Sequence, residues 1–349
     1  MKTAEVLECL DQKWYPGFDK KTTEALCEYA GPFTAFVGTS VYGNEVYHSA
    51  ICIVINLFHM AVLLSNSMRT SFIFSIMAAV ALMDILALTC VLGEKWISFY
   101  KELYPCDSKT TDYNLMMLDM IRQHIRNFTR RCSTWLSLSI AIIRALVIRY
   151  PMSVRFEMLS RPRTIIYVIG GVLCVIVPNS IGDVLSLDVS TFYKNFDCRR
   201  YAPSNRYYSV DPSKLFRTSR LFRPIVKISE ALISKVILPA TILQAVRQNT
   251  SYLVLAQTFT FFIAEFPLGI VFLLQYPKFG AGVDILLGAF ERFFTSVLMA
   301  TTATHMFICF FMSSQYRLAS RLFVRGGYPL KVKQKRIQYN FDSKDVSSN

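Results

Sequence analysis

The sequence predicts an all-α membrane protein, a bundle of seven transmembrane helices followed by a short amphipathic helix on the membrane surface. Two observations lead to this fold class. Hydrophobic residues make up 53% of the 349-residue chain and charged residues only 18%, whereas about a quarter of the residues in a soluble domain are charged. Seven predominantly apolar segments also follow one another, and each is long enough to cross a ~30 Å hydrocarbon core, which takes about 20 residues.

The charge distribution predicts the orientation of these spans. The net charge is +14, and the basic residues gather in loops and at the C-terminus. Because Lys and Arg hold short loops in the cytoplasm, we expect an extracellular N-terminus and a cytoplasmic C-terminus in the plasma membrane. The expected domains are an acidic extracellular segment at 1–46, a seven-span domain at 47–312, an amphipathic helix at 313–325 and a cytoplasmic tail at 326–349.

The same composition excludes several function classes. The membrane accounts for the basic excess, so we expect no nucleic-acid partner. The chain has no CxxC, HExxH, P-loop, GxSxG or kinase motif, so we expect no enzymatic activity, no cofactor and no dedicated metal site. The N-terminus lacks the apolar core of a signal peptide, so the first span is expected to direct the chain to the membrane.

The first two predicted spans each carry a polar residue. Asn56 lies in the first, residues 47–66, where its amide can hydrogen-bond a neighbouring helix. Asp84 lies near the middle of the second, residues 71–93. A carboxylate at that depth is costly and seldom only structural. We therefore expect Asp84 to be an ion or proton site coupled to helix movement.

The third predicted helix, residues 114–150, has an unusually polar first half. Asp119, Arg122, Arg126 and Arg130 recur at spacings of three and four, so they share one face of the helix. That face cannot meet lipid. It either lines a water-filled cavity that opens outward or pairs with other charges within the bundle, and the spacing leaves both interpretations open.

A single arginine, Arg144, lies in the apolar second half of the same helix, seven residues before Pro151. An arginine at this depth either extends its side chain to the membrane surface or faces the bundle interior and marks a functional site. This segment alone does not separate the two interpretations.

The remaining spans carry further polar residues and prolines. The fourth is predicted at 164–185, and a long outer loop follows at 187–223. The fifth, sixth and seventh are predicted at 224–246 with Glu230 and Pro239, at 252–276 with Glu265 and Pro267, and at 283–312 with Glu291 and His305. Beyond them, Tyr316, Leu322 and Phe323 alternate with arginines, which predicts a helix on the inner leaflet with membrane lipid as a partner.

These residues stand where rhodopsin-like G-protein-coupled receptors carry characteristic residues. The matching positions are Asn56, Asp84, Arg144 with Pro151, Pro239, Pro267 and the segment MSSQYR at 312–317. The chain resembles more closely the nematode serpentine receptors of class W, which are related to FMRFamide-type neuropeptide receptors. That resemblance rests on RRCSTWL at 130–136, AIIRALVIRYPM at 141–152, FFIAEFPLG at 261–269 and ICFFMSSQYR at 308–317.

The resemblance implies a role for several residues. Asp84 is expected at a sodium or proton site inside the bundle, with Asn56 beside it. Arg144 is expected at the cytoplasmic end, where it contacts a heterotrimeric G protein, which favours its functional interpretation. Cys106 and Cys198 are expected to form an extracellular disulfide. Separately from the resemblance, Cys9 and Cys27 in the polar N-terminal segment are a candidate second pair outside the cell.

The chain also departs from the rhodopsin-like pattern. Ile143 replaces the acidic residue before the family arginine, Glu265 replaces the tryptophan before the sixth-span proline, and His305 replaces the asparagine of Asn-Pro-x-x-Tyr. Pro239 and Pro267 are 28 positions apart. At ~1.5 Å per residue, that length reaches the inner membrane surface and returns, so the third inner loop is very short. We hypothesise weakened coupling, or the loss of a segment that relatives have.

The resulting functional expectation is a G-protein-coupled receptor for a neuropeptide. The expected ligand-binding residues are Arg126, Arg130, Glu230, Glu265 and Glu291, whose mixed charges suit a peptide and whose arginines can bind a carboxylate bidentately. Pairing of these charges within the bundle is the structural alternative. Two functional alternatives are a chemosensory receptor for small molecules and a proton-coupled transporter or channel that uses Asp84 and Glu265.

Overall fold

The computed structural model describes most of the chain outside the fifth and sixth predicted spans. The described residues are 15, 17–66, 68, 71–104, 108–149, 164–193, 206–213, 263, 265–271, 274 and 280–325. Six residues that the sequence singled out, Cys9, Cys106, Pro151, Cys198, Glu230 and Pro239, lie outside these ranges.

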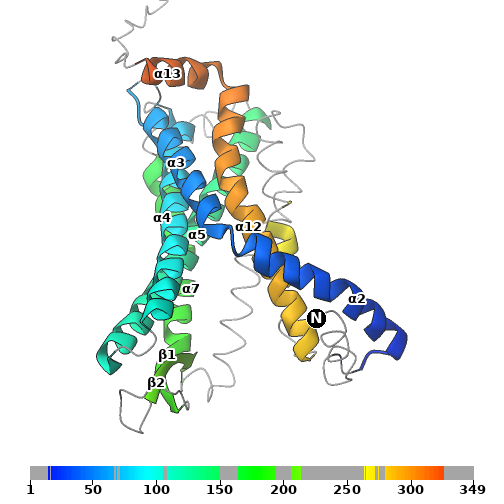
Figure 1. Ribbon diagram of the computed structural model, residues 1–349. Helices are drawn as coiled ribbons and strands as arrows, with labels where there is room; N and C mark the ends of the chain where they lie inside the picture. The colour runs from blue at the N-terminus through cyan, green and yellow to red at the C-terminus, as the bar shows by residue number, and fades with distance from the viewer. Residues whose placement is uncertain are drawn as a thin grey trace, which may run out of the picture.

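The described part of the chain is an elongated helical bundle (Figure 1). Helix α13 crosses one end of the bundle, and α2 projects from the opposite part (Figure 1). The predicted all-α fold class is therefore confirmed, including the short helix that follows the last span. The elements before α7 are α2 (Lys20–Phe36), a π-helical turn η1 (Val37–Val41), α3 (Glu45–Leu63), α4 (Phe72–Leu103) and α5 (Lys109–Arg149). The later helices are α7 (Thr164–Ser186), α12 (Ala281–Met312) and α13 (Ser314–Val324).

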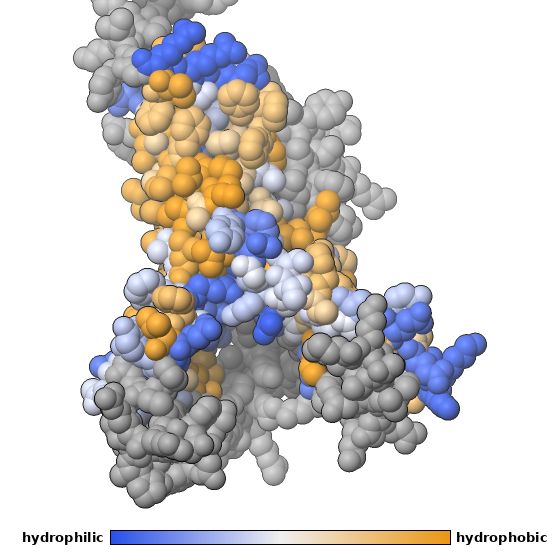
Figure 2. Space-filling model, viewed as in Figure 1, coloured by the Kyte–Doolittle hydropathy of each residue, from blue (hydrophilic) through white to orange (hydrophobic). Residues whose placement is uncertain are grey.

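Four of the described helices are long and apolar enough to cross a membrane, namely α3, α4, α7 and the Gly282–Phe311 part of α12. Hydrophobic side chains cover the long middle part of the bundle, and hydrophilic ones gather around α13 (Figure 2). On α3, for example, Ile51 is 58% exposed and Val54 66% exposed. An apolar surface of this extent is what a lipid environment covers.

Helices α4 and α5 extend beyond the thickness of a bilayer. Helix α4 has 32 residues, or about 48 Å at ~1.5 Å per residue, against a ~30 Å hydrocarbon core. It ends at Leu103, whereas the apolar segment ends at residue 93. The helix continues because the first charged residues beyond the apolar segment find partners on other helices. Lys95 pairs with Glu45 of α3 at 3.0 Å, and Glu94 pairs with arginines of α5.

The buried core lies toward the α13 end of the bundle. It contains side chains from α3, α4, α5, α7, α12 and α13, among them Ile76, Ile140 and Tyr316. Tyr316 is fully buried, and its hydroxyl lies 2.8 Å from Nδ1 of the buried His59 in α3. Arg317 donates hydrogen bonds to the Phe310 and Phe311 carbonyls at the end of α12. These contacts fix the amphipathic helix across the end of the bundle.

A two-stranded antiparallel hairpin was not predicted from the sequence. It consists of β1 (Leu187–Tyr193) and β2 (Arg206–Pro212), with Leu187 opposite Pro212, within the segment predicted as a long loop. The Tyr208 N–H donates to the Asp112 carboxylate at 3.2 Å, and the Tyr208 ring packs against Tyr113 with centroids 5.0 Å apart. The hairpin therefore anchors the first turn of α5.

Candidate functional site

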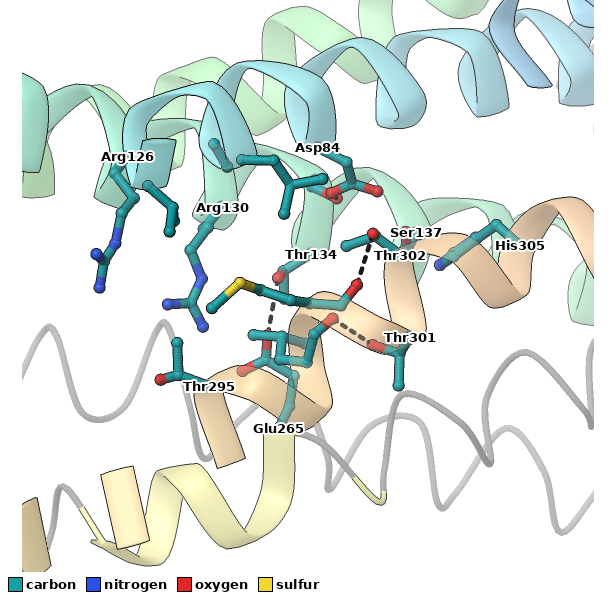
Figure 3. A pocket seen from close by; sticks show the side chains of 16 residues that line it. Asp84, Arg126, Arg130, Thr134, Ser137, Glu265, Thr295, Thr301, Thr302 and His305 are labelled. Carbon is teal, nitrogen blue, oxygen red and sulfur yellow. Dashed lines mark hydrogen bonds between the residues drawn. The ribbon is translucent and has the colours of Figure 1, made fainter. Parts of the chain in front are cut away.

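One cavity brings together most of the charged residues that the sequence predicted to be functional. It lies between α4, α5, α12 and the helical segment 265–271 (Figure 3), and its volume is about 50 Å³. Its charged and titratable lining residues are Asp84, Arg126, Arg130, Glu265 and His305. Hydroxyl side chains supply much of the remaining lining: Ser133, Thr134, Ser137, Thr295, Thr301 and Thr302.

Helix α5 supplies one whole side of this cavity. Arg126, Arg130, Thr134 and Ser137 line it, and they follow one another at spacings of three and four residues. This spacing keeps them on one helical face. From Arg126 to Ser137 the face extends about 16 Å, at ~1.5 Å per residue. Arg126 and Arg130, the second half of the polar face that the sequence predicted, thus line the cavity.

Two neighbouring hydroxyls of α5 hold two carboxylates that come from different helices. Ser133 Oγ donates to Asp84 Oδ1 at 2.5 Å. Thr134 Oγ1 donates to Glu265 Oε1 at 3.2 Å (Figure 3). Asp84 is only 6% exposed and Glu265 only 5%. Burying a carboxylate is costly unless hydrogen bonds compensate. The hydroxyl pair therefore contributes to fixing α4 and segment 265–271 against α5.

The arginines of α5 differ in their partners. Arg122 pairs with Asp119 at 2.6 Å and with Glu94 at 3.2 Å. Glu94 also pairs with Arg126 at 3.0 Å. The two interpretations of the polar face therefore both hold, for different residues. Arg122 pairs within the bundle and does not line the cavity, whereas Arg126 pairs with Glu94 and also lines the cavity.

Arg130 and Arg131 are adjacent but have different surroundings. Arg131 points to α7 and pairs with Asp183 at 2.5 Å. Arg130 lines the cavity, and its guanidinium extends into it (Figure 3). Within the described part of the chain, Arg130 makes no hydrogen bond and no ion pair. The charges of Glu265, Glu291 and Asp84 act on it without direct contact.

Asn56 joins the inner part of the cavity to α3. Its Nδ2 donates to the Cys52 carbonyl at 2.9 Å and to Thr302 Oγ1 at 3.2 Å. Asn56 is 1% exposed, and its Oδ1 has no hydrogen-bond partner among the described residues. Thr302 lines the cavity together with Asp84 and His305. Asn56 is thus connected to the cavity through Thr302.

Three further predicted residues lie on described helical segments but are not among the described lining residues of the cavity. Arg144 lies in the last two turns of α5, and Pro267 lies in segment 265–271, two residues after Glu265. Glu291 lies on α12, four residues before the lining residue Thr295. Cys27 is disulfide-bonded.

Sequence reasoning missed the hydroxyl residues and Glu94. Ser133, Thr134 and Ser137 continue the three-and-four spacing of the arginines, so the same pattern contained the signal for them. Glu94 had no such signal, because its contacts with Arg122 and Arg126 depend on how α4 packs against α5.

No described cluster of three or more His, Cys, Asp and Glu side chains forms a metal centre. The Ser133 hydroxyl contacts Asp84, and Ser137 and Thr302 supply further hydroxyl oxygens to the cavity lining. Oxygen donors of this kind suit a hard cation rather than a transition metal.

Comparison with known proteins identifies the family. A search of curated proteins finds no match. The model of one family, described as the serpentine type 7TM GPCR chemoreceptor Srw, matches residues 44–246 and 240–326. The two matches overlap at 240–246 and together cover most of the chain. The chain therefore belongs to the serpentine type 7TM GPCR chemoreceptor Srw family, whose members are seven-helix receptors of the membrane.

Proposed function

We propose that the protein is a receptor that transmits the binding of an extracellular ligand in this cavity to a heterotrimeric G protein. The observation that carries the proposal is that one cavity is lined by α4, α5, α12 and segment 265–271. A ligand there contacts four elements at once. It favours one arrangement of them by its differential affinity, and the coupling between ligand and G protein is reciprocal.

The proposed output end lies at the far end of α5. Arg144 is 14 residues beyond Arg130, or about 21 Å along the helix at ~1.5 Å per residue. Ile143 belongs to the same core cluster as Tyr316 of α13. In this proposal the α13 end is cytoplasmic, the hairpin and α2 are extracellular, and Arg144 contacts the G protein.

A peptide is the first candidate ligand. Arg126, Arg130 and Glu265 offer both signs of charge to one ligand, as the termini and side chains of a peptide require. Glu291 and Glu230 are proposed as further contacts, Glu230 from the sequence alone. The Cys106–Cys198 disulfide, from the family resemblance, remains part of the proposal.

A small chemosensory molecule is the second candidate. The cavity volume is about 50 Å³, below the range of about 300–1,000 Å³ typical of ligand sites, so a small molecule fits it more readily than a whole peptide. The chemoreceptor description of the family favours the same candidate. Asp84 is proposed as a sodium or proton site that responds to either ligand.

The third inner loop, between the fifth and sixth predicted spans, bears on how strongly the receptor couples to a G protein. The two family matches overlap at 240–246, at the end of the fifth predicted span and immediately before the short connection at 247–251. The family model thus matches the chain in two separate parts that meet at this loop. This supports the hypothesis that the chain lacks a segment that the family has and that its coupling to the G protein is weakened.

A ligand screen tests the proposed function. The full chain is expressed with a promiscuous G protein, and a peptide library and a set of small metabolites are applied in parallel. We expect one set to contain an activator whose effect is lost when the cavity variant Arg130→Gln replaces the wild type. Ligand-independent proton currents or uptake, without G-protein activation by any ligand, would show instead a transporter or channel that uses Asp84 and Glu265.

A further inference from the structure

We propose that the cavity binds a zwitterion: the acidic group of the ligand pairs with Arg130, and its ammonium group leads inward toward Asp84 and Ser137. This inference rests on the proposed ligand-binding role of the cavity and names the chemical class of the ligand. Two independent observations support it, one for each charge of the ligand.

The first observation is that Arg130 differs from the other arginines of the polar face. Arg122, Arg126 and Arg131 each pair with a carboxylate of the receptor. Arg130 has no such pair among the described residues, yet its side chain lines the cavity and extends into it (Figure 3). A guanidinium offers five donors in a fixed planar fork that matches a carboxylate. A ligand carboxylate would supply the partner that Arg130 lacks.

The second observation is that four of the hydroxyls that line the cavity have already donated their hydrogens. Ser133 donates to Asp84 and Thr134 to Glu265. On α12, Thr301 donates to the Leu298 carbonyl and Thr302 to the Met299 carbonyl, each at 2.7 Å. Because a hydroxyl carries a single hydrogen, these four side chains present only lone pairs to the cavity.

The inner cavity therefore presents many hydrogen-bond acceptors to a ligand and few hydrogen-bond donors. Asp84 adds a carboxylate to the same region, and Ser137 adds a further hydroxyl. An ammonium group, which has three donors and no acceptor, matches this lining. A second carboxylate would meet lone pairs and a negative charge there.

The positions along α5 give the order of the two charges. Ser137 lies seven residues beyond Arg130, or about 10 Å along the helix axis. Arg130 is therefore on the side of the N-terminal end of α5, and the acceptor groups are on the side of Arg144. In the proposed orientation the ligand enters with its amine first, and its acid follows.

The inference predicts which blocked ligands fail. The probes are glycine, γ-aminobutyric acid and the dipeptide glycylglycine, together with the N-acetylated and the C-amidated form of each. Binding is measured as thermal stabilisation of the full-length receptor in lipid nanodiscs. We expect at least one free zwitterion to stabilise the receptor, and its acetylated and amidated forms to bind at least tenfold more weakly. The free probe that binds most tightly shows whether the site suits a single amino acid, such as glycine or γ-aminobutyric acid, or a short peptide such as glycylglycine.

Variants then assign each charge to its residue. Arg130→Gln should bring the acid and its amide within about twofold of each other, while Arg130→Lys should keep part of the preference. Arg131→Gln is the matched control, because the adjacent Arg131 pairs with Asp183 of α7 and does not line the cavity, and it should keep the preference for the acid. Asp84→Asn should reduce the preference for the free amine.

Several outcomes would overturn the inference. Equal binding of blocked and free forms would do so, as would the absence of stabilisation by every member of the set. If Arg130 only neutralises the charges of Asp84 and Glu265, Arg130→Gln will change the affinities for the acid form and the amide form of the ligand equally. The proposed function fails separately, if a zwitterion binds as described but no G protein is activated.

Discussion

Ser133 donates its hydroxyl hydrogen to Asp84 at 2.5 Å, and this bond joins α5 to α4 inside the cavity. The next residue along α5, Thr134, forms the corresponding bond to Glu265. The two carboxylates are thus held by adjacent positions of one helix. Any movement of α5 along its axis changes both bonds together, which links the cavity lining to the helix that carries Arg144.

Removal of the Ser133 hydroxyl should destabilise the bundle. Ser133→Ala leaves the buried Asp84 without this donor, and an unsatisfied buried group costs about 1–3 kcal/mol. We expect a lower melting temperature in nanodiscs. Ser139→Ala is the matched control, because Ser139 donates only to the Trp135 carbonyl of its own helix. Equal melting temperatures for the two variants would contradict the structural role of the Ser133–Asp84 bond.

The contact between His59 and Tyr316 should behave as a coupled pair. Burial raises the pKa of the Tyr316 hydroxyl, so this group keeps its hydrogen, and it lies 2.8 Å from His59 Nδ1. Tyr316→Phe should cost about 1–3 kcal/mol, because it leaves the imidazole unpaired. The double variant His59→Leu/Tyr316→Phe should recover part of this loss. Additive losses in a double-mutant cycle of unfolding free energies would mean that the bond contributes nothing.

Glu94 should limit the response to acidic ligands. Its carboxylate pairs with Arg126 at the cavity, so Glu94→Gln releases that guanidinium for a ligand. We expect affinity for a carboxylate ligand to rise about threefold to tenfold, which corresponds to at most about 1.4 kcal/mol. Glu102→Gln makes the same change at an exposed position of α4 and should leave affinity unaltered. A fall in affinity with Glu94→Gln would show that Glu94 positions Arg126 for binding instead.

The short third inner loop should limit signalling. Insertion of a longer loop at 248–250, taken from a relative of the family, is expected to raise G-protein activation, because it extends the two flanking helices. An insertion of the same length composed of glycine and serine controls for spacing alone. If neither insertion raises activation above that of the unmodified chain, the hypothesis of weakened coupling is wrong.

Hydropathy and spacing predicted the fold and one side of the site. The apolar segments identified α3, α4, α7 and α12, and the three-and-four spacing placed Arg126 and Arg130 on one face of α5. Those predictions succeed because the periodicity of a helix is a local property of the sequence. The alternation of arginines and apolar residues after the last span predicted α13 for the same reason.

The partners across the cavity could not be predicted in the same way. Thr134 and Glu265 are 131 positions apart, and Arg126 and Glu94 are 32 apart. Their contacts depend on how the helices pack, and no local pattern records that. The β1–β2 hairpin was missed because its strands are only seven residues long and lie in a polar segment.

The account depends most on the claim that ligand binding at one end of α5 activates a G protein at the other end. The most direct test is ligand-stimulated nucleotide exchange by a heterotrimeric G protein, measured with the full chain in nanodiscs. We expect the wild type to stimulate exchange, and Arg144→Ala to bind the same ligand equally well but to lose at least tenfold of the stimulation. Ligand binding without any stimulation by the wild type, or full stimulation by Arg144→Ala, would contradict the account.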